Sequence, residues 1–328
     1  MMKYNRLGKT GYEVSELSFG TWGIGGDWGK TDDQESLRAL DVAIDRGVNF
    51  FDTADVYGGG HAEELLGKAT KGKEDQIYIA SKFCRAGDLN DPDNYSEKTV
   101  RQYLDATLKR IQRDSLDLYQ IHCPPFEVLK DGRVFEVLDK LKAEGKIRHY
   151  GVSVETVEEG LFCLNNENVS TLQVILNMMR QKSLETLVPE ALKQDVGIIV
   201  RVPLASGLLT GKFSADHQFE ADDHRNFNKD GQAFNVGETF GGIEFTKGVE
   251  LSNELKWIAE DRDTMAKAAL KWLLEQRGVS TVIPGFKSVS QVEENLGAID
   301  VRSYSEDELE QIADFYQEKV HENIRGAY

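Results

Sequence analysis

The sequence predicts an α/β fold in which eight parallel strands close into a (β/α)8 TIM barrel, in one domain over residues 1–328. Apolar strand-like runs alternate with helical runs eight times along the chain. Residues 197–202 form a nearly continuous β-branched run, which is typical of a strand buried on both faces of a parallel sheet. No Pro- or Ser-rich linker and no shift in composition divides the chain, so we expect a single domain.

The chain is expected to open with a hairpin over residues 4–14, with Gly8-Lys9-Thr10-Gly11 as its turn. A first short strand follows at 17–19, and Thr31-Asp32-Asp33-Gln34 resembles a capping box for a helix that ends at Arg46. The next strands are expected at 48–51, 76–80, 116–121, 148–152, 171–176 and 197–202, and the helices between them at 62–71, 96–110, 133–144, 156–164 and 185–194.

The alternation is interrupted at residues 212–248, which are polar, rich in Gly, Asp and Asn, and show no helical period. A loop of this length is usually functional or disordered. Helices are then expected at 249–260 and 264–276, followed by a strand at 280–283 and a helix capped by Ser290-x-x-Glu293. A final helix capped by Ser305-x-x-Glu308 makes two helices beyond the eight of the barrel.

Composition excludes several classes of function. The net charge is −17, from 56 acidic and 39 basic residues, so neither nucleic acid nor an anionic membrane is expected as a partner. No apolar run is long enough to span a membrane, and no secretory leader is expected at the N-terminus. The 3 cysteines are scattered, which argues against a disulfide framework or a zinc site and favours a reducing, cytoplasmic location.

Polar residues follow four successive predicted strands: Asp52, Lys82, His122 and Ser153, with Tyr57 in the loop after Asp52. Functional residues of a parallel barrel gather at the carboxyl ends of its strands. Taken alone, Asp52 could be a turn residue and His122 a core histidine. An acid, a phenol, an ammonium and an imidazole at adjacent strand ends together indicate a site. A metal centre or a Cys123–His122 nucleophile pair is improbable, because side chains adjacent in an extended chain point apart.

The four groups suit proton transfer to a carbonyl. A free phenol has a pKa of about 10, and an adjacent Lys82 ammonium, held in place by Asp52, would lower the pKa of Tyr57. His122 could orient the carbonyl oxygen. No side chain can donate hydride, so a cofactor is implied.

The chain resembles the aldo-keto reductase superfamily over nearly its whole length, and it looks most like the bacterial and potassium-channel-β-subunit-like branches. The resemblance is carried by Phe19-Gly20-Thr21-Trp22, Phe51-Asp52-Thr53-Ala54-x-x-Tyr57-Gly58, Ser81-Lys82, Ile121-His122, Gly151-Val152-Ser153, Pro203-Leu204-x-x-Gly207-x-Leu209-Thr210-Gly211-Lys212, and Ile283-Pro284-Gly285 followed by Gln291-x-x-Glu294-Asn295. The segment 203–212 and Asp222-Asp223-His224-Arg225 point to those branches.

This resemblance implies an NADPH-dependent enzyme that reduces small aldehydes or ketones to alcohols by hydride transfer. It implies a catalytic tetrad of Asp52, Tyr57, Lys82 and His122, with Tyr57 as the general acid. It also implies that NADPH (NADP+) is bound by Gly20, Thr21, Trp22, Asp52, Ser153, Gln173, Arg201, Pro203, Leu204, Gly207, Lys212, Lys287, Gln291, Glu294 and Asn295. Lys287 stands where a basic residue can meet a 2′-phosphate, which favours NADPH over NADH; the alternative is a solvated loop lysine.

Two positions depart from the family pattern. Val154 replaces the usual Asn, and Arg201 stands where an aromatic residue commonly stacks on nicotinamide. Trp22, Tyr57, Phe83 and His122 are expected to line the substrate pocket, with Trp28, Phe126, Met178 and Met179 as neighbours, although ordinary packing would explain the apolar ones equally well. Residues 212–248 are a candidate lid over the cofactor, or else a surface insertion.

Two other functions remain open at this point. One is an NADPH-sensing regulatory subunit with little turnover, and the other is a barrel lyase or isomerase that uses Lys82 as a Schiff base. The expected partner is a small-molecule carbonyl compound. Both a monomer and a self-associated ring are compatible with the sequence.

Overall fold

The computed structural model describes residues 1–26, 28–29 and 31–328. Its central feature, within those residues, is one sheet of eight parallel strands in the order β10-β9-β8-β7-β6-β5-β4-β3. The strands are β3 (Phe19–Gly20), β4 (Phe50–Asp52), β5 (Tyr78–Phe83), β6 (Leu116–His122), β7 (Ile147–Ser153), β8 (Val169–Ile175), β9 (Gly197–Arg201) and β10 (Val279–Val282). The predicted (β/α)8 fold is confirmed.

The sheet closes between its first and last strands. The Ser18 amide donates to the Val282 carbonyl oxygen at 2.8 Å, and the Val282 amide donates to Glu16 O at 3.1 Å. Farther along, the Gly20 amide donates to Pro284 O at 3.1 Å. The two edges therefore pair with each other, as the edges of a barrel must.

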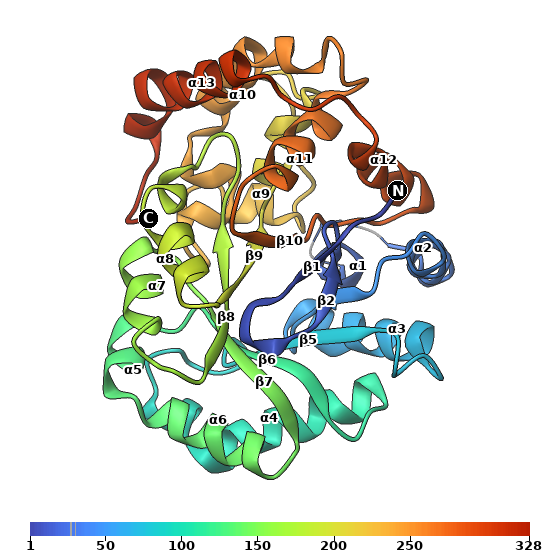
Figure 1. Cartoon of the computed structure of the whole chain (residues 1–328), viewed down its shortest axis with the longest axis vertical. Helices are drawn as coiled ribbons and strands as arrows, with labels where there is room; N and C mark the ends of the chain where they lie inside the picture. The colour runs from blue at the N-terminus through green and yellow to red at the C-terminus, as the bar shows by residue number, and fades with distance from the viewer. Residues whose placement is uncertain (27, 30) are drawn as a thin grey trace.

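Eight helices alternate with these strands and surround them (Figure 1). Each buries an apolar stripe; in α4, for example, Val100, Leu104, Leu108 and Ile111 lie three or four residues apart and are buried. The eight are α2 (Asp33–Asp45), α3 (His61–Thr70), α4 (Glu97–Ile111), α6 (Arg133–Ala143), α7 (Val157–Cys163), α8 (Leu187–Lys193), α11 (Met265–Leu274) and α12 (Val289–Leu296). The two expected extra helices are α10 (Phe245–Glu254) and α13 (Glu306–Phe315), and the structure adds the short helices α1 (Trp22–Gly25), α5 (Phe126–Asp131) and α9 (His224–Phe227).

Helix caps were predicted with mixed success. The Ser305–Glu308 capping box of α13 is confirmed, with the Ser305 amide donating to Glu308 at 2.8 Å. The predicted caps at Thr31 and Ser290 are wrong. Asp32 caps α2 by accepting from the Glu35 amide at 2.8 Å, and Ser288 caps α12 by accepting from the Gln291 amide at 3.3 Å. In both cases the true cap is the residue with extended backbone directly before the helix.

The predicted hairpin is confirmed as β1 (Tyr4–Arg6) paired antiparallel with β2 (Glu13–Ser15). It covers the amino ends of the barrel strands: Lys9 N donates to Asp195 O just before β9, and Ser15 N donates to the Asn49 side chain just before β4. Its buried residues Leu7 and Val14 join Phe50, Ala80, Leu118, Ile199 and Ile283 in a small core of their own. The hairpin therefore plugs the end of the barrel opposite the carboxyl ends of the strands.

Residues 212–248 contain more structure than predicted, because α9 lies within them and α10 begins at Phe245 rather than 249. The second half of this segment is docked on the barrel. Ser206 Oγ donates to Glu238 O at 3.2 Å and accepts from the Phe240 amide at 3.1 Å. All three cysteines are free and buried, and no helix among the described residues is both long and apolar enough to cross a membrane.

Candidate active site

Asp52, Lys82 and Tyr57 meet at the carboxyl ends of β4 and β5. The Lys82 ammonium is fully buried, and it donates to Asp52 Oδ1, to Thr53 O at 2.9 Å and to the Tyr57 hydroxyl at 3.0 Å. Burial by itself disfavours the ammonium, but Asp52 and Tyr57 hold the pKa of Lys82 above its ordinary value. Lys82 is therefore a fixed cation in contact with a phenol.

Two amide side chains complete the surroundings of Asp52. Its second oxygen, Oδ2, accepts from Gln120 Nε2 at 2.9 Å and from Gln173 Nε2 at 2.8 Å. Gln173 also donates to Gln120 Oε1 at 3.2 Å, so the two amides are linked. Gln173 was expected to bind the nicotinamide carboxamide, and here it supports Asp52 from the cavity wall. Gln120 was not predicted, although a polar residue two positions before His122 on a buried strand was a signal for it.

The Tyr57 phenol carries its proton. Burial raises the pKa of Tyr57, and Lys82 opposes this rise without reversing it. The expectation of a pKa below the ordinary value is therefore wrong for this structure, because desolvation outweighs the ammonium. A protonated phenol that is hydrogen-bonded to an ammonium can still donate its proton to a neighbouring substrate oxygen.

His122, the last residue of β6, lies near Tyr57, with the two ring centroids 5.9 Å apart in an edge-to-face arrangement. Burial and the nearby cations Arg85, Lys82 and Arg201 hold the pKa of His122 well below its ordinary value. The imidazole is therefore neutral, and it can contact a carbonyl oxygen without adding charge. Its Nδ1 has no hydrogen-bond partner among the described residues.

Glycines fix the backbone that presents Tyr57. Gly58 has a left-handed φ of 60°, and a Cβ at this position would overlap the Gly25 carbonyl oxygen of α1. A Cβ on Gly25 would in turn lie 2.8 Å from the Tyr57 carbonyl carbon. The glycine-rich loop after β3 is thus explained by close packing of α1 against the Tyr57 turn.

The barrel strands end in strained turns around this site. Cys84, Cys123 and Val202, the residues directly after β5, β6 and β9, have φ values of 89°, 52° and 53°. Such values are rare for residues with a side chain, and most of all for a β-branched valine. Backbone strain of this kind clusters at functional sites.

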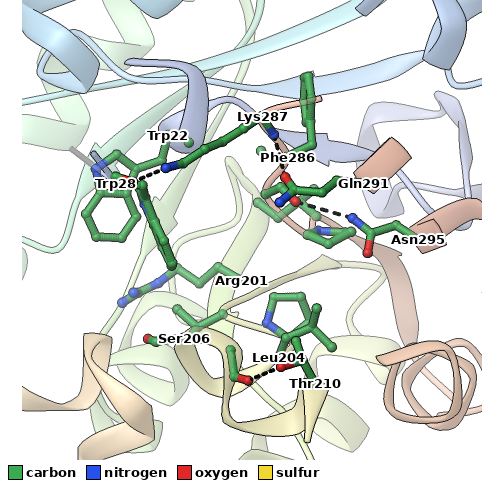
Figure 2. Close-up of a pocket in the computed structure, with 18 of the residues that line it drawn as sticks. Trp22, Trp28, Arg201, Leu204, Ser206, Thr210, Phe286, Lys287, Gln291 and Asn295 are labelled. Carbon is green, nitrogen blue, oxygen red and sulfur yellow. Dashed lines mark hydrogen bonds between the residues drawn. The ribbon is translucent and has the colours of Figure 1, made fainter. Parts of the chain in front are cut away.

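A cavity of about 400 Å³ opens beside Tyr57 and His122. Figure 2 shows Trp22, Trp28 and Arg201 on one side of it and Phe286, Lys287, Gln291 and Asn295 on another. The predicted residues that line it are Gly20, Trp22, Trp28, Asp52, Tyr57, His122, Gln173, Arg201, Pro203, Leu204, Gly207, Lys212, Lys287, Gln291, Glu294 and Asn295. Ser206, Thr210, Phe213, Arg225, Glu238 and Phe286 also line it and were not predicted as site residues.

The far side of the cavity is braced by polar contacts. The Lys287 ammonium donates to the Trp28 carbonyl oxygen, and the Lys287 amide donates to Gln291 Oε1 at 2.7 Å. Asn295 Nδ2 donates to Gly285 O at 3.2 Å, and Glu294 accepts from Thr264 Oγ1 at 2.6 Å. Burial lowers the pKa of Lys287, so this cation would gain from an anionic ligand.

Some predicted residues lie outside the cavity. Phe83 is wrong as a pocket residue: it follows the inward-facing Lys82 on β5, points into the outer core and stacks on Tyr119 at 4.7 Å. Met178 and Met179 are buried in the same core, and Phe126 packs edge-to-face on Phe162. Thr21 is turned to the Asp52 backbone, with Oγ1 donating to Asp52 O at 3.2 Å. Ser153 Oγ lies 3.3 Å from the Cys123 sulfur rather than at the cavity wall.

A buried ionic cluster adjoins His122, and we call it the Arg85 cluster: Arg85, Glu155, Arg201 and Glu238. Arg85 contacts Glu155 at 3.2 Å and forms a bidentate pair with Glu238. Arg201 contacts Glu155 at 3.2 Å and Glu238 at 3.8 Å. Arg85 Nε also donates to the His122 carbonyl oxygen at 3.2 Å. Glu238 lies in the 212–248 segment, so the cluster ties this segment to three strand ends.

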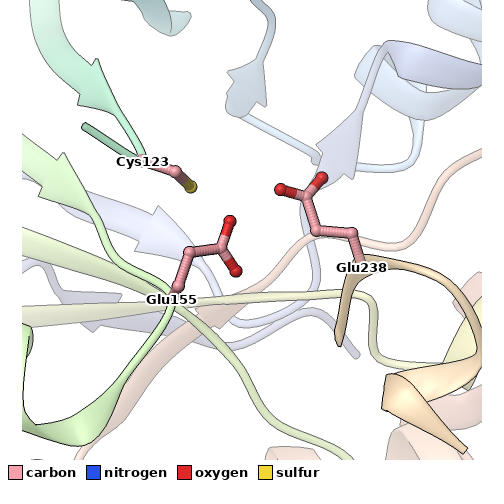
Figure 3. A group of neighbouring side chains, drawn as sticks. All are labelled: Cys123, Glu155 and Glu238. Carbon is pink, nitrogen blue, oxygen red and sulfur yellow. The ribbon is translucent and has the colours of Figure 1, made fainter. Parts of the chain in front are cut away.

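Cys123, Glu155 and Glu238 come close enough together to suggest a metal site, as Figure 3 shows. The two carboxylates are already paired with the guanidinium groups of Arg85 and Arg201. Burial, with Glu155 beside it, raises the pKa of the Cys123 thiol, which makes it a poor metal ligand. We therefore assign these carboxylates to ion pairs.

Comparison with known proteins gives a consistent result. The aldo/keto reductase family model matches residues 16–317. The aldo-keto reductase YhdN of Bacillus subtilis is 32% identical over 299 residues, which are 89% of this chain and 87% of YhdN. A probable voltage-gated potassium channel subunit beta of Arabidopsis thaliana is 29% identical over 92% of each chain. The structure of an aldo-keto reductase from Klebsiella pneumoniae in complex with NADPH superposes with a TM-score of 0.72, at 25% identity and over 100% of both chains.

Proposed function

The chain belongs to the aldo/keto reductase family and is an NADP(H)-dependent oxidoreductase, and from this we propose that it reduces small aldehydes or ketones to alcohols with Tyr57 as the general acid. The observation that carries the proposal is the contact of a buried ammonium, Lys82, with the Tyr57 hydroxyl at 3.0 Å, at the wall of a cavity. A cation that stabilises the conjugate base of the acid favours proton donation to a developing alkoxide.

The cavity fits the cofactor that the family uses. Its volume is in the range of small-molecule and cofactor pockets. Gly207, which lines the cavity, has a φ of 100°, and a Cβ there would lie 2.9 Å from the Phe213 ring, so the turn after β9 needs a glycine at this position. Lys212, Arg225 and Lys287 provide cations for phosphate groups. When bound, NADPH supplies the hydride that the carbonyl carbon receives.

Each residue of the tetrad then has a defined task. Tyr57 gives its proton to the carbonyl oxygen and becomes a phenolate. Lys82 stabilises this phenolate as an ion pair, and Asp52, held by Gln120 and Gln173, keeps the lysine charged and in place. The neutral His122 orients the carbonyl oxygen toward Tyr57. Overall one proton is taken up for each carbonyl that is reduced.

We propose that NADPH is preferred over NADH because of Lys287, which lines the cavity and is partly desolvated. In support, the Klebsiella relative was solved with NADPH. Lys287→Met should weaken NADPH binding by about tenfold, as expected for the loss of one charge-assisted contact, and leave NADH binding unchanged. Equal losses for both cofactors would show that Lys287 supports the loop rather than the phosphate.

The decisive experiment compares wild type with Tyr57→Phe. Consumption of NADPH is followed by its absorbance with a panel of aldehydes and ketones, with NADH alongside. We expect a fall in kcat of about 10²–10⁴-fold for the variant with unchanged NADPH binding. Wild-type and variant proteins that both bind NADPH but reduce no carbonyl would instead favour an NADPH-sensing subunit. That alternative has one point in its support, the similarity to a probable channel subunit beta.

A further inference from the structure

The cavity wall beside the catalytic groups carries a cation that the reaction does not consume. Arg201, at the end of β9, is 9% exposed and lines the cavity. Its guanidinium lies 3.3 Å from the sulfur of Cys123, the residue after His122, and donates to Val154 O at 3.3 Å. Arg201 is close enough to lower the pKa of His122. A group that reacts beside His122 therefore experiences this charge together with that of the Glu238 carboxylate, which lines the same cavity.

How far the charge of Arg201 is compensated depends on the protonation of Glu155. The Arg85 cluster holds two guanidinium groups and two carboxylates, all buried or nearly so. Burial opposes its ionisation, but Arg85 and Arg201 hold the pKa of Glu238 below its ordinary value, so Glu238 is an anion. Burial and the Glu238 carboxylate raise the pKa of Glu155 to about 7, against the attraction of Arg201. The cluster is therefore neutral when Glu155 is ionised and carries one positive charge when Glu155 is protonated.

The two forms of a nicotinamide ring respond differently to such a charge. The oxidised ring is a cation and the reduced ring is neutral, so a fixed positive charge nearby disfavours the oxidised form. A ring that exchanges hydride with a carbonyl held by Tyr57 and His122 would lie in the cavity whose wall Arg201 shares with them. An aromatic residue in place of Arg201 would attract a cationic ring through its π-face. A guanidinium repels it.

We propose that Arg201 makes this site bind reduced cofactor more tightly than oxidised cofactor, and that the protonation of Glu155 strengthens this preference. The inference rests on the proposed function, because it assumes that a nicotinamide cofactor binds in this cavity. Arg201 is thus a specificity-determining residue that biases the enzyme toward carbonyl reduction and toward release of the oxidised cofactor.

The pH dependence has a definite sign. The groups that face Glu155 are Arg201 from β9, Arg85 after β5, Cys123 after β6, Glu238 from the 212–248 segment and Arg180 after β8, whose guanidinium donates to the Glu155 carbonyl oxygen at 3.4 Å. Below a pH of about 7 Glu155 is protonated and the cluster is cationic. The ratio of the Kd of NADP+ to that of NADPH should then be highest in mild acid, and it should fall as the pH rises through about 7.

The experiment measures the two dissociation constants by titration calorimetry, without substrate, one unit below and one unit above that pH. We expect Arg201→Met to lower the Kd ratio by about tenfold. Glu155→Gln removes the titrating proton with little change in shape, and it should keep the ratio at its acidic value throughout. The matched control is Arg148→Met, which also removes one positive charge but lies 63% exposed at the amino end of β7, and it should leave the ratio unchanged.

Proton release gives a second measurement that is independent of activity. Binding of NADP+ at neutral pH should expel a proton from Glu155, whereas binding of NADPH should not, and Glu155→Gln should abolish the difference. A Kd ratio that is equal in wild type, Arg201→Met and Glu155→Gln would overturn the inference while leaving the proposed function intact. Failure of both cofactor forms to bind the wild type would overturn the proposed function, and this inference with it.

Discussion

Asp52→Asn should destabilise the protein far more than its small change in size suggests. The substitution removes the counter-charge of Lys82, a fully buried ammonium whose other contacts are Thr53 O and the Tyr57 hydroxyl. It also brings an amide N–H₂ against Lys82, Gln120 or Gln173, which all donate to Asp52 in the wild type. Removing one partner of a buried pair costs about 3–5 kcal/mol. We expect the free energy of unfolding to fall by about this amount.

The assay is urea unfolding of the wild type, Asp52→Asn, Lys82→Met and the double variant. The pKa of Lys82 is raised in the folded protein, so the contribution of the pair is fully present below the ordinary value of 10.5 and is lost only as the pH rises through the higher folded value. Urea unfolding at neutral pH therefore measures the whole contribution of the pair to stability. Because the double variant leaves no unpaired charge, its loss should be smaller than the sum of the single losses by about 2 kcal/mol. Losses that add to within about 0.5 kcal/mol would refute the reasoning.

Three further predictions test the surroundings of this pair. Gly58→Ala should destabilise the protein by at least about 1 kcal/mol more than Gly59→Ala, because both glycines have the same left-handed backbone but only a methyl at Gly58 meets the Gly25 carbonyl oxygen; equal urea midpoints would contradict this. Since the buried His122 ring stays neutral while an unfolded histidine takes up a proton, wild-type stability should fall relative to His122→Gln by about 1.4 kcal/mol per pH unit below about pH 6.5; parallel pH profiles would argue against a depressed pKa. If residues 212–223 close over the cofactor, limited proteolysis there should slow when NADPH is added, and an unchanged cleavage rate would identify a plain surface loop.

The barrel could be predicted because each strand and helix has a local signal, either a run of apolar residues or a helical period. The predicted bounds are wrong where a contact with a residue distant in the sequence determines where an element begins. Val48 and Asn49 look like the start of a strand, yet β4 begins at Phe50 because the Asn49 side chain pairs with the hairpin through Ser15 N and Glu13 O. The sequence of α9 likewise shows no helical period of apolar residues. This helix is capped by Asp223, whose carboxylate also binds the side chain of Arg225.

The site residues also fall into two groups, those that can be placed from local sequence and those that depend on contacts with distant residues. Asp52, Lys82 and His122 lie at strand ends, so the topology alone brings them together, and Tyr57 follows one of them closely. Glu238 could not be predicted, because it lies in an aperiodic loop and its role depends on Arg85 and Arg201 from other strands. The raised pKa of Tyr57 was missed for a related reason. Proximity to Lys82 can be inferred from sequence, whereas the extent of desolvation depends on the packed cavity.

The hairpin covers the amino end of the barrel, so the cavity opens at the other end of the strands (Figure 1). Leu7 and Val14 fill that end, whereas Tyr57 lines the cavity at the carboxyl ends of the strands. Under the proposed function each turnover consumes one proton, and Tyr57 faces the same cavity that would hold the substrate and its alcohol product. Departure of the alcohol therefore exposes the Tyr57 phenolate to the solvent that refills the cavity, and the acid can regain its proton there.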